Sequence, residues 1–150
     1  MKPIAVRSSA AVQAPAEFVW DFLRVYGNDL DWRSGLEKMN QSPPGPVRDG
    51  VRVEETLRVL GRVVESLVEV SDVREGHSFA WRVVEGAIAE GSRSVTATGV
   101  DSCRVDIVKR VTLTGSDRLL RPLLAVVITR TERGDLRRVK RALEQAWKDR

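Results

Sequence analysis

The feature that most constrains the fold is a long stretch, residues 51–114, in which short runs of alternating apolar and polar residues are separated by turn signals. Five such runs follow one another: "VRVEETLRVL", "RVVESLVEVSD", "SFAWRVVEG", "AIAEGSRSVTATGV" and "CRVDIVKRVTLTG". A period of two predicts strands buried on one face, and the short turns predict antiparallel neighbours. Two further strands are expected upstream, over residues 4–14 and over "LEKMNQS" at 36–42.

Two helical segments are expected between those upstream strands. Residues 15–27 carry apolar side chains at helical spacing, with Pro15 suited to a first turn and Gly27 to a stop. The stretch "DLDWRSGL" at 29–36 then predicts a short second helix or a turn. Prolines and glycines in "PPGPVRDG" at 43–50 predict a hairpin loop.

A long helix is predicted for the tail, residues 116–150, with Ser116 as its N-cap. No other segment is long enough to cover the apolar face of the sheet, and the space between sheet and helix is the default ligand site. The predicted tail helix carries two apolar sets that lie about 150° apart around a straight helix. Either the helix breaks near Gly134, or its first half is buried almost all round. These sets are Leu120, Leu123, Leu124, Val127 and Ile128, then Leu136, Val139, Leu143 and Trp147.

Length and composition favour one globular domain over residues 1–150. The chain is 42% hydrophobic and 31% charged, which is globular rather than disordered. No apolar run approaches the ~20 residues of a membrane span, and the first residues do not resemble a signal peptide. The lone Cys103 excludes an internal disulfide. We therefore expect a cytoplasmic protein, and the high use of Arg, Val, Ala and Gly is compatible with a GC-rich bacterial genome.

Positive charge is concentrated in the tail. Residues 116–150 hold 10 Lys/Arg and 5 Asp/Glu, a surplus of +5, whereas residues 1–115 hold 15 and 16. A basic segment can contact nucleic acid or anionic lipid, but a solvated helix face is the favoured interpretation. No specific nucleic-acid partner is expected, because no stacking aromatic residues alternate with basic ones over residues 1–115. A homodimer is left open.

The residues that usually carry metal or nucleophilic chemistry are few. His77, the only histidine, lies in the turn sequence "REGHS", so no His–His–carboxylate set exists and no metal is expected. Cys103 has no histidine near it in sequence to activate it. No glycine-rich loop suits a phosphate, and no cofactor is expected. Asp29, Asp31 and Arg33 are interpreted as a polar helix surface.

Three stretches resemble a known family: "VQAPAEFVWDFLRVYGNDLDWRSGL", "GVRVEETLRVLGRVVESLVEVSD" and "FAWRVVEGAIAEGSRSVTATGV". Their order and spacing resemble the START-like, or SRPBCC, superfamily, and within it the polyketide cyclase/dehydrase-like branch. The resemblance implies an α+β helix-grip fold. That fold has a curved antiparallel sheet of about seven strands wrapped around a long C-terminal helix, with two short helices after the first strand. It also implies a cavity for a hydrophobic small molecule.

The resemblance also implies site residues. In related ligand-binding members the Glu of an "E.L" motif faces the cavity, and here that position is Glu65. The corresponding aromatic and serine positions are Trp81 and Ser94, and strand alternation places Phe79 and Val83 on the same side as Trp81. The alternatives are an outward, solvated Glu65 and a Trp81 that only packs in the core.

Three more residues are candidates for the cavity wall. Trp32 follows the first helix and would either form the cavity mouth or act as a structural plug. Glu55 and Lys109 lie on the apolar side of their strands. They would either form an inward pair or be turned outward by bulges.

Departures from the abscisic acid receptor branch argue against hormone sensing. The gate segment is reduced to "VLGRV", the latch position reads "AIAEG", and a carboxylate-binding basic residue is replaced near Glu37, so the ligand need not be a carboxylate.

Three functions remain. One is a cyclase or dehydratase acting on a polyketide-like or aromatic molecule, with Glu65 as general acid or base and Ser94 or Tyr26 polarising a carbonyl. The second is a non-catalytic carrier or sensor, because fold alone does not choose. The third is a protein-interaction module, which is favoured if large side chains fill the cavity completely.

Overall fold

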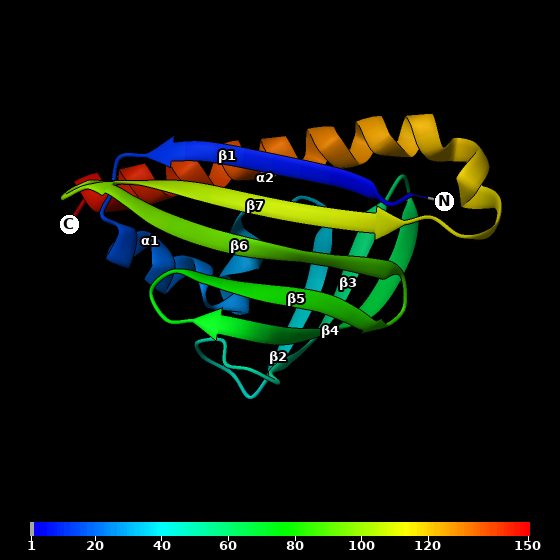
Figure 1. Ribbon diagram of the computed structural model, residues 1–150, viewed down its shortest axis with the longest axis horizontal. Helices are drawn as coiled ribbons and strands as arrows, with labels where there is room; N and C mark the ends of the chain where they lie inside the picture. Colours follow the sequence, from blue (N-terminus) through cyan, green and yellow to red (C-terminus); the bar gives the residue numbers. More distant parts are fainter. Residues whose placement is uncertain (1) are drawn as a thin grey trace.

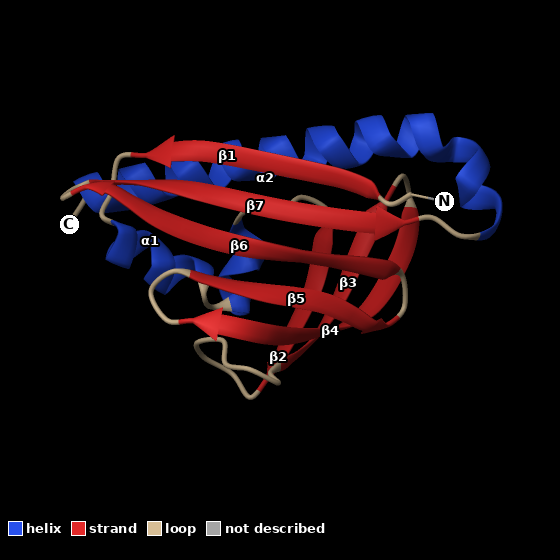
Figure 2. Cartoon of the chain, in the orientation of Figure 1, coloured by secondary structure: helices blue, strands red, loops and turns tan. Residues whose placement is uncertain are grey.

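The computed structural model describes residues 2–150, in which a seven-stranded antiparallel sheet curves around one long helix (Figure 1; Figure 2). The strands are β1 (Ile4–Val12), β2 (Leu36–Ser42), β3 (Arg52–Val59), β4 (Arg62–Arg74), β5 (Ser78–Glu85), β6 (Ile88–Gly99) and β7 (Ser102–Thr112). The helices are α1 (Ala16–Leu23), α2 (Arg121–Lys148) and the 3-10 helices η1 (Tyr26–Asp31) and η2 (Gly115–Leu120). This arrangement confirms the predicted helix-grip fold.

The sheet order is β1-β7-β6-β5-β4-β3-β2, so consecutive hairpins build most of it. The first strand instead pairs with the last, from Ile4 opposite Val111 to Val12 opposite Cys103. Side chains alternate between the concave face and solvent, as the sequence period requires. In β7, for example, Val105 is buried while its neighbour Arg104 is exposed.

Helix α2 is continuous through Gly134, so the predicted break is wrong. The alternative of a first half buried all round is also wrong, because Leu123 is 52% exposed. The two halves differ because the second half packs against the closed core through Val139 and Leu143. The first half covers a cavity on one side only. Ser116, the predicted N-cap, lies instead in η2, and α2 begins at Arg121.

One end of the space between sheet and helix is filled by aromatic residues. Phe79 stacks edge-on against Trp20, with ring centroids 6.1 Å apart, and lies 5.8 Å from the Tyr26 ring. These rings close the end of the sheet next to α1 and leave the other end open. No helix within residues 2–150 is long and apolar enough to cross a membrane.

Candidate ligand-binding site

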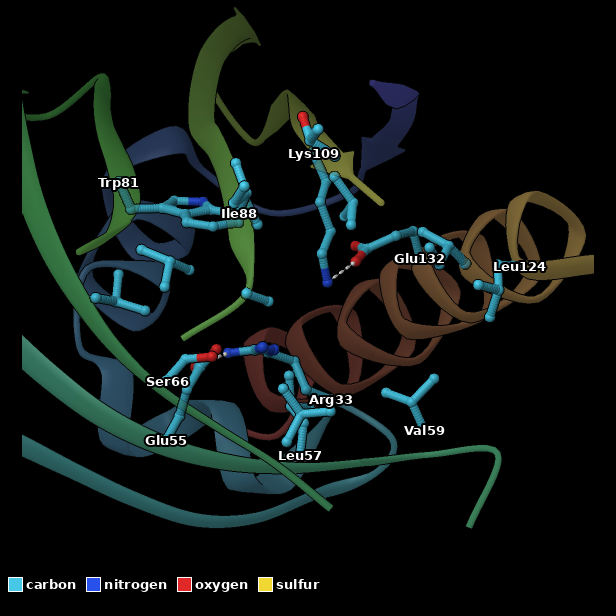
Figure 3. A pocket seen from close by; sticks show the side chains of 18 of the residues that line it. Arg33, Glu55, Leu57, Val59, Ser66, Trp81, Ile88, Lys109, Leu124 and Glu132 are labelled. Atoms are coloured by element: carbon cyan, nitrogen blue, oxygen red, sulfur yellow. Dashed lines mark hydrogen bonds and ion pairs between the residues drawn. The ribbon is translucent and has the colours of Figure 1, made fainter. Parts of the chain in front are cut away.

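A cavity of about 220 Å³ lies between the concave face of the sheet and the first half of α2 (Figure 3). The cavity is therefore not filled by side chains, as an interaction module alone would require. Its mouth lies where the β3–β4 hairpin, the start of β6 and η2 meet, because the lining residues Arg62 and Ile88 are exposed to solvent there. Its apolar wall includes Leu57, Val64, Trp81, Val83, Leu124 and Ile128.

Trp81 faces the cavity because the strand beside it provides space. The indole lies over Gly91, its cross-strand partner on β6. A Cβ atom at Gly91 would lie 2.6 Å from Cζ2 of Trp81 and 2.2 Å from the carbonyl oxygen of Val108. A side chain at this position would therefore displace either the indole or the backbone of β7.

One ion pair lies in the inner part of the cavity. Arg33, just after η1, donates to Oε2 of Glu55 on β3 at 3.0 Å and to Oδ2 of Asp29 at 3.0 Å. Burial disfavours the charged guanidinium, but the carboxylates of Glu55 and Asp29 outweigh burial and raise the pKa of Arg33. Arg33 therefore remains a cation that holds the Glu55 carboxylate at the cavity wall.

Behind that pair lies a second buried arginine. Arg93 on β6 donates to both carboxylate oxygens of Asp29, and to the carbonyl oxygen of Leu23 at 3.1 Å. Its guanidinium lies 4.8 Å from the Tyr26 ring centroid and 5.2 Å from that of Trp32. Burial lowers the pKa of Arg93, but the charge of Asp29 outweighs it, so the net shift is upward. These side chains form a row of alternating charges with no net charge, called here the inner charge chain: Arg93, Asp29, Arg33 and Glu55.

A separate ion pair spans the cavity nearer its mouth. Nζ of Lys109 on β7 lies 3.0 Å from Oε1 of Glu132 on α2, and both side chains line the cavity (Figure 3). The pair connects the sheet to the helix across the cavity.

Two aromatic side chains complete the inner wall. Burial is the main cause that raises the pKa of Tyr26 well above its usual value, so the phenol stays protonated and is a hydrogen-bond donor. Trp32 is 4% exposed, and its Nε1–H has no acceptor among residues 2–150. Both residues line the cavity.

The structure brings five of the eight predicted site residues to the cavity: Trp32, Glu55, Trp81, Val83 and Lys109. Their roles stay predictions. Glu55 and Lys109 both face inward, but they do not pair with each other. Each has a different partner, Arg33 and Glu132 respectively.

The inward orientation predicted for Glu65 and Ser94 is wrong. Glu65 is exposed, because alternation along β4 turns Val64 and Ser66 toward the cavity instead. Ser94 does not line the cavity either, because Arg93 occupies the inward position of β6. Phe79 faces inward as predicted but is buried in the core behind the cavity.

Sequence reasoning missed six charged residues at or behind the cavity wall: Asp29, Arg33, Arg62, Arg93, Asp117 and Glu132. Asp29 and Arg33 were interpreted as helix surface, yet Asp29 is fully buried. One signal was available in β6, where Arg93 shares its strand face with the apolar Val95. No local pattern indicated that Asp29 and Arg93 would meet.

Comparison with known proteins identifies the class. The family model described as "Polyketide cyclase / dehydrase and lipid transport" matches residues 3–144. The chain therefore belongs to this polyketide cyclase/dehydrase and lipid transport family. A search of proteins of curated function finds no significant match.

Solved structures share the fold at low sequence identity. TTHA0849 from Thermus thermophilus is 19% identical with a TM-score of 0.80, over 95% of this chain and 98% of that one. The Zhui aromatase/cyclase from Streptomyces sp. R1128 is 19% identical with a TM-score of 0.78, over 94% and 93%. Norcoclaurine synthase from Thalictrum flavum, in complex with dopamine and hydroxybenzaldehyde, is 20% identical with a TM-score of 0.64, over 95% and 84%.

Proposed function

We propose that the protein binds a compact polyketide-like or aromatic molecule in the cavity and acts on it as a cyclase or dehydratase. The observation that carries this proposal is the presence of two ion pairs, Arg33–Glu55 and Lys109–Glu132, on the wall of a largely apolar cavity. Taking charged groups out of water is costly, and apolar residues would pack such a space at no loss of stability. The pairs are therefore better explained by chemistry on a ligand than by folding.

The size of the cavity and the structural neighbours support a compact ligand. Its volume of about 220 Å³ falls below the roughly 300–1,000 Å³ typical of small-molecule sites. One neighbour is described as an aromatase/cyclase, and another was solved with dopamine and hydroxybenzaldehyde, two molecules with one aromatic ring each.

In this proposal Glu55 replaces Glu65 as the general base. Glu55 takes a proton from a carbon next to a ligand carbonyl, and the enolate oxygen is stabilised by the guanidinium of Arg33 or the hydroxyl of Tyr26. The enolate carbon adds to a second carbonyl, whose oxygen takes a proton from the ammonium of Lys109. Loss of that hydroxyl with a proton from the neighbouring carbon releases water and leaves a double bond. The proton on Glu55 leaves through solvent, which also reprotonates Lys109.

The test uses Glu55→Gln, with Glu65→Gln as its matched control on the neighbouring strand. Binding of naphthol is followed by tryptophan fluorescence. Turnover is followed with a linear δ-diketone, whose intramolecular aldol condensation yields a cyclohexenone and water. We expect Glu55→Gln to keep naphthol binding and lose turnover, and Glu65→Gln to keep both. Equal turnover in Glu55→Gln and the parent protein would remove Glu55 from the reaction.

The alternative is a non-catalytic carrier or sensor of a hydrophobic molecule. One observation favours it: each cavity carboxylate already has a cationic partner, which stabilises its charged form and weakens it as a base. Naphthol binding without diketone turnover in the parent protein would select this alternative. Absence of binding to both probes would contradict both functions.

A further inference from the structure

Exposed apolar side chains are concentrated around the cavity mouth. Within residues 2–150, nine large hydrophobic residues are exposed, and only Leu30 and Val100 lie away from this end. The other seven are on the β3–β4 hairpin, at the start of β6, in η2 and in the first turns of α2. They are Leu60, Val63, Ile88, Leu119, Leu120, Leu123 and Val126, called here the apolar tip. Leu119, at 85% exposed, and Ile88, at 56%, have little protein cover.

The tip is a connected structural unit. Nη1 of Arg62, at the start of β4, lies 3.1 Å from Oδ1 of Asp117 in η2, so the hairpin is held against η2. Figure 1 shows η2, the β5–β6 turn and the beginning of α2 at the same end of the molecule. Clusters of exposed apolar side chains of this kind mark interaction surfaces rather than random exposure.

A row of arginines continues the same face of α2. Leu123 and Val126 are followed at spacings of three and four by exposed arginines, so one helix face changes from apolar to basic along its length. These are Arg130, Arg133, Arg137 and Arg141, called here the basic stripe. No carboxylate lies within ion-pair distance of these four among residues 2–150, whereas Arg138 on the neighbouring face is paired with Asp135.

We propose that the apolar tip and the basic stripe form a docking surface for an anionic lipid bilayer. A helix face with leucines at one end and unpaired cations along the rest fits the membrane interface. There, apolar side chains enter the acyl boundary while arginines meet negative headgroups. The proposal depends on these surface residues alone and not on the occupant of the cavity.

Other occupants fit the surface less well. Nucleic acid would engage the stripe but offers no apolar partner for Leu119 and Leu123. A second copy of the chain would bring a tail with a surplus of +5 against an identical tail. An anionic bilayer provides both an apolar layer and the opposite charge.

The experiment is co-sedimentation with vesicles of phosphatidylcholine alone and with vesicles in which part of it is replaced by phosphatidylserine. The first variant is Leu119→Ser/Leu123→Ser, with Val100→Ser as its control, because Val100 is 90% exposed on the β6–β7 turn at the opposite end. The second is Arg133→Gln/Arg137→Gln, with Arg82→Gln/Arg104→Gln on the outer sheet face as the charge-matched control. All seven substituted residues are exposed, so the fold should be retained, which circular dichroism checks.

We expect binding only to the phosphatidylserine vesicles, with weaker binding as salt is added. Each lost arginine should lower partitioning by about fivefold, and the double leucine change by about tenfold or more. Both controls should match the parent protein.

Four outcomes would overturn the proposal. The first is no sedimentation with either vesicle, and the second is unchanged binding in the leucine variant. The third is a dimer in sedimentation equilibrium that the leucine variant abolishes, without vesicle binding, which would assign the tip to a second copy. Salt-sensitive binding to duplex DNA that the leucine variant retains, again without vesicle binding, would assign the stripe to nucleic acid.

Discussion

Removing the charge of Asp29 should destabilise the protein strongly, because its carboxylate holds two buried arginines of the inner charge chain. The Asp29 carboxylate is fully buried and accepts three hydrogen bonds, two from Arg93 and one from Arg33. In Asp29→Asn the side chain keeps its shape, but two buried guanidinium groups then share only the Glu55 carboxylate. Arginine does not release its proton in proteins, so the excess charge stays buried.

The expected cost follows from breaking a buried pair on one side only. Such changes lower the free energy of unfolding by about 3–5 kcal/mol, out of a total of about 5–15 kcal/mol for a typical domain. Arg93→Met should cost a similar amount, because the two carboxylates then share only Arg33. The double variant Asp29→Leu/Arg93→Met removes both charges. It should therefore cost clearly less than the sum of the single changes.

Urea unfolding followed by tryptophan fluorescence measures these effects, since Trp20 and Trp32 are both buried in the core. The slope of the unfolding free energy against urea concentration should be the same in every variant. A constant slope shows that the changes alter stability and not the compactness of either state. A cost below about 1 kcal/mol for Asp29→Asn would show that the pair behaves like a surface ion pair. Strictly additive single and double variants would show that Asp29 and Arg93 are not energetically coupled.

Three further predictions follow from burial of titratable groups. The only tyrosine, Tyr26, should show no tyrosinate absorbance near its ordinary pKa of 10.0 in the folded protein, and should ionise only when alkali unfolds the chain; a normal titration step would contradict its burial. Burial raises the pKa of Asp135 in the folded protein above its ordinary value of 3.8. The ionised carboxylate therefore lowers the unfolding free energy at pH values above the raised pKa, and this loss disappears below the pKa of the unfolded chain. Asp135→Asn should keep Oδ1 as acceptor for Ser34 and raise the unfolding free energy at neutral pH, with no gain below about pH 4 in urea titrations. Burial also raises the pKa of the Cys103 thiol, so it should react with a thiol reagent only after unfolding, and a fast reaction in the native state would contradict this.

The fold could be predicted because its signals are local and repeated. Alternation over residues 51–114 indicated the strands, and β2 was predicted with the same bounds, residues 36–42. The course of α2 could not be predicted from its own pattern. The two alternatives were a break near Gly134 and a first half buried almost all round, whereas α2 is continuous and Leu123 is exposed.

The cavity residues were harder to predict, because a strand reverses its side-chain direction at every residue. A motif match that is shifted by one position therefore reverses the orientation, which explains the errors at Glu65 and Ser94. The inward neighbours Ser66 and Arg93 are each one residue away. Residues assigned by alternation with apolar neighbours, such as Glu55 and Val83, do line the cavity.

The inner charge chain could not be found in the sequence because its members are brought together only by the fold. Asp29 and Arg93 are 64 residues apart. Arg33 and Glu55 belong to a loop and to a strand that meet through the packing of η1 against β2, the neighbour of β3. Asp29 and Arg33 alone have the sequence context of ordinary surface charges.

The charge balance of the cavity restricts its ligand. Four cations line it, Arg33, Arg62, Arg93 and Lys109, and each is paired with a carboxylate of the chain. A carboxylate ligand that binds one of the inner cations, Arg33, Arg93 or Lys109, would have to displace its carboxylate partner and leave that partner unpaired in a poorly hydrated space, which is costly. A neutral ligand with a carbonyl or hydroxyl oxygen can accept from Arg33 or Tyr26 while every pair stays intact. Naphthol should therefore bind, and naphthoate, of nearly the same shape, should bind at least about tenfold more weakly. Tighter binding of naphthoate would show that one of these pairs opens to receive an anion.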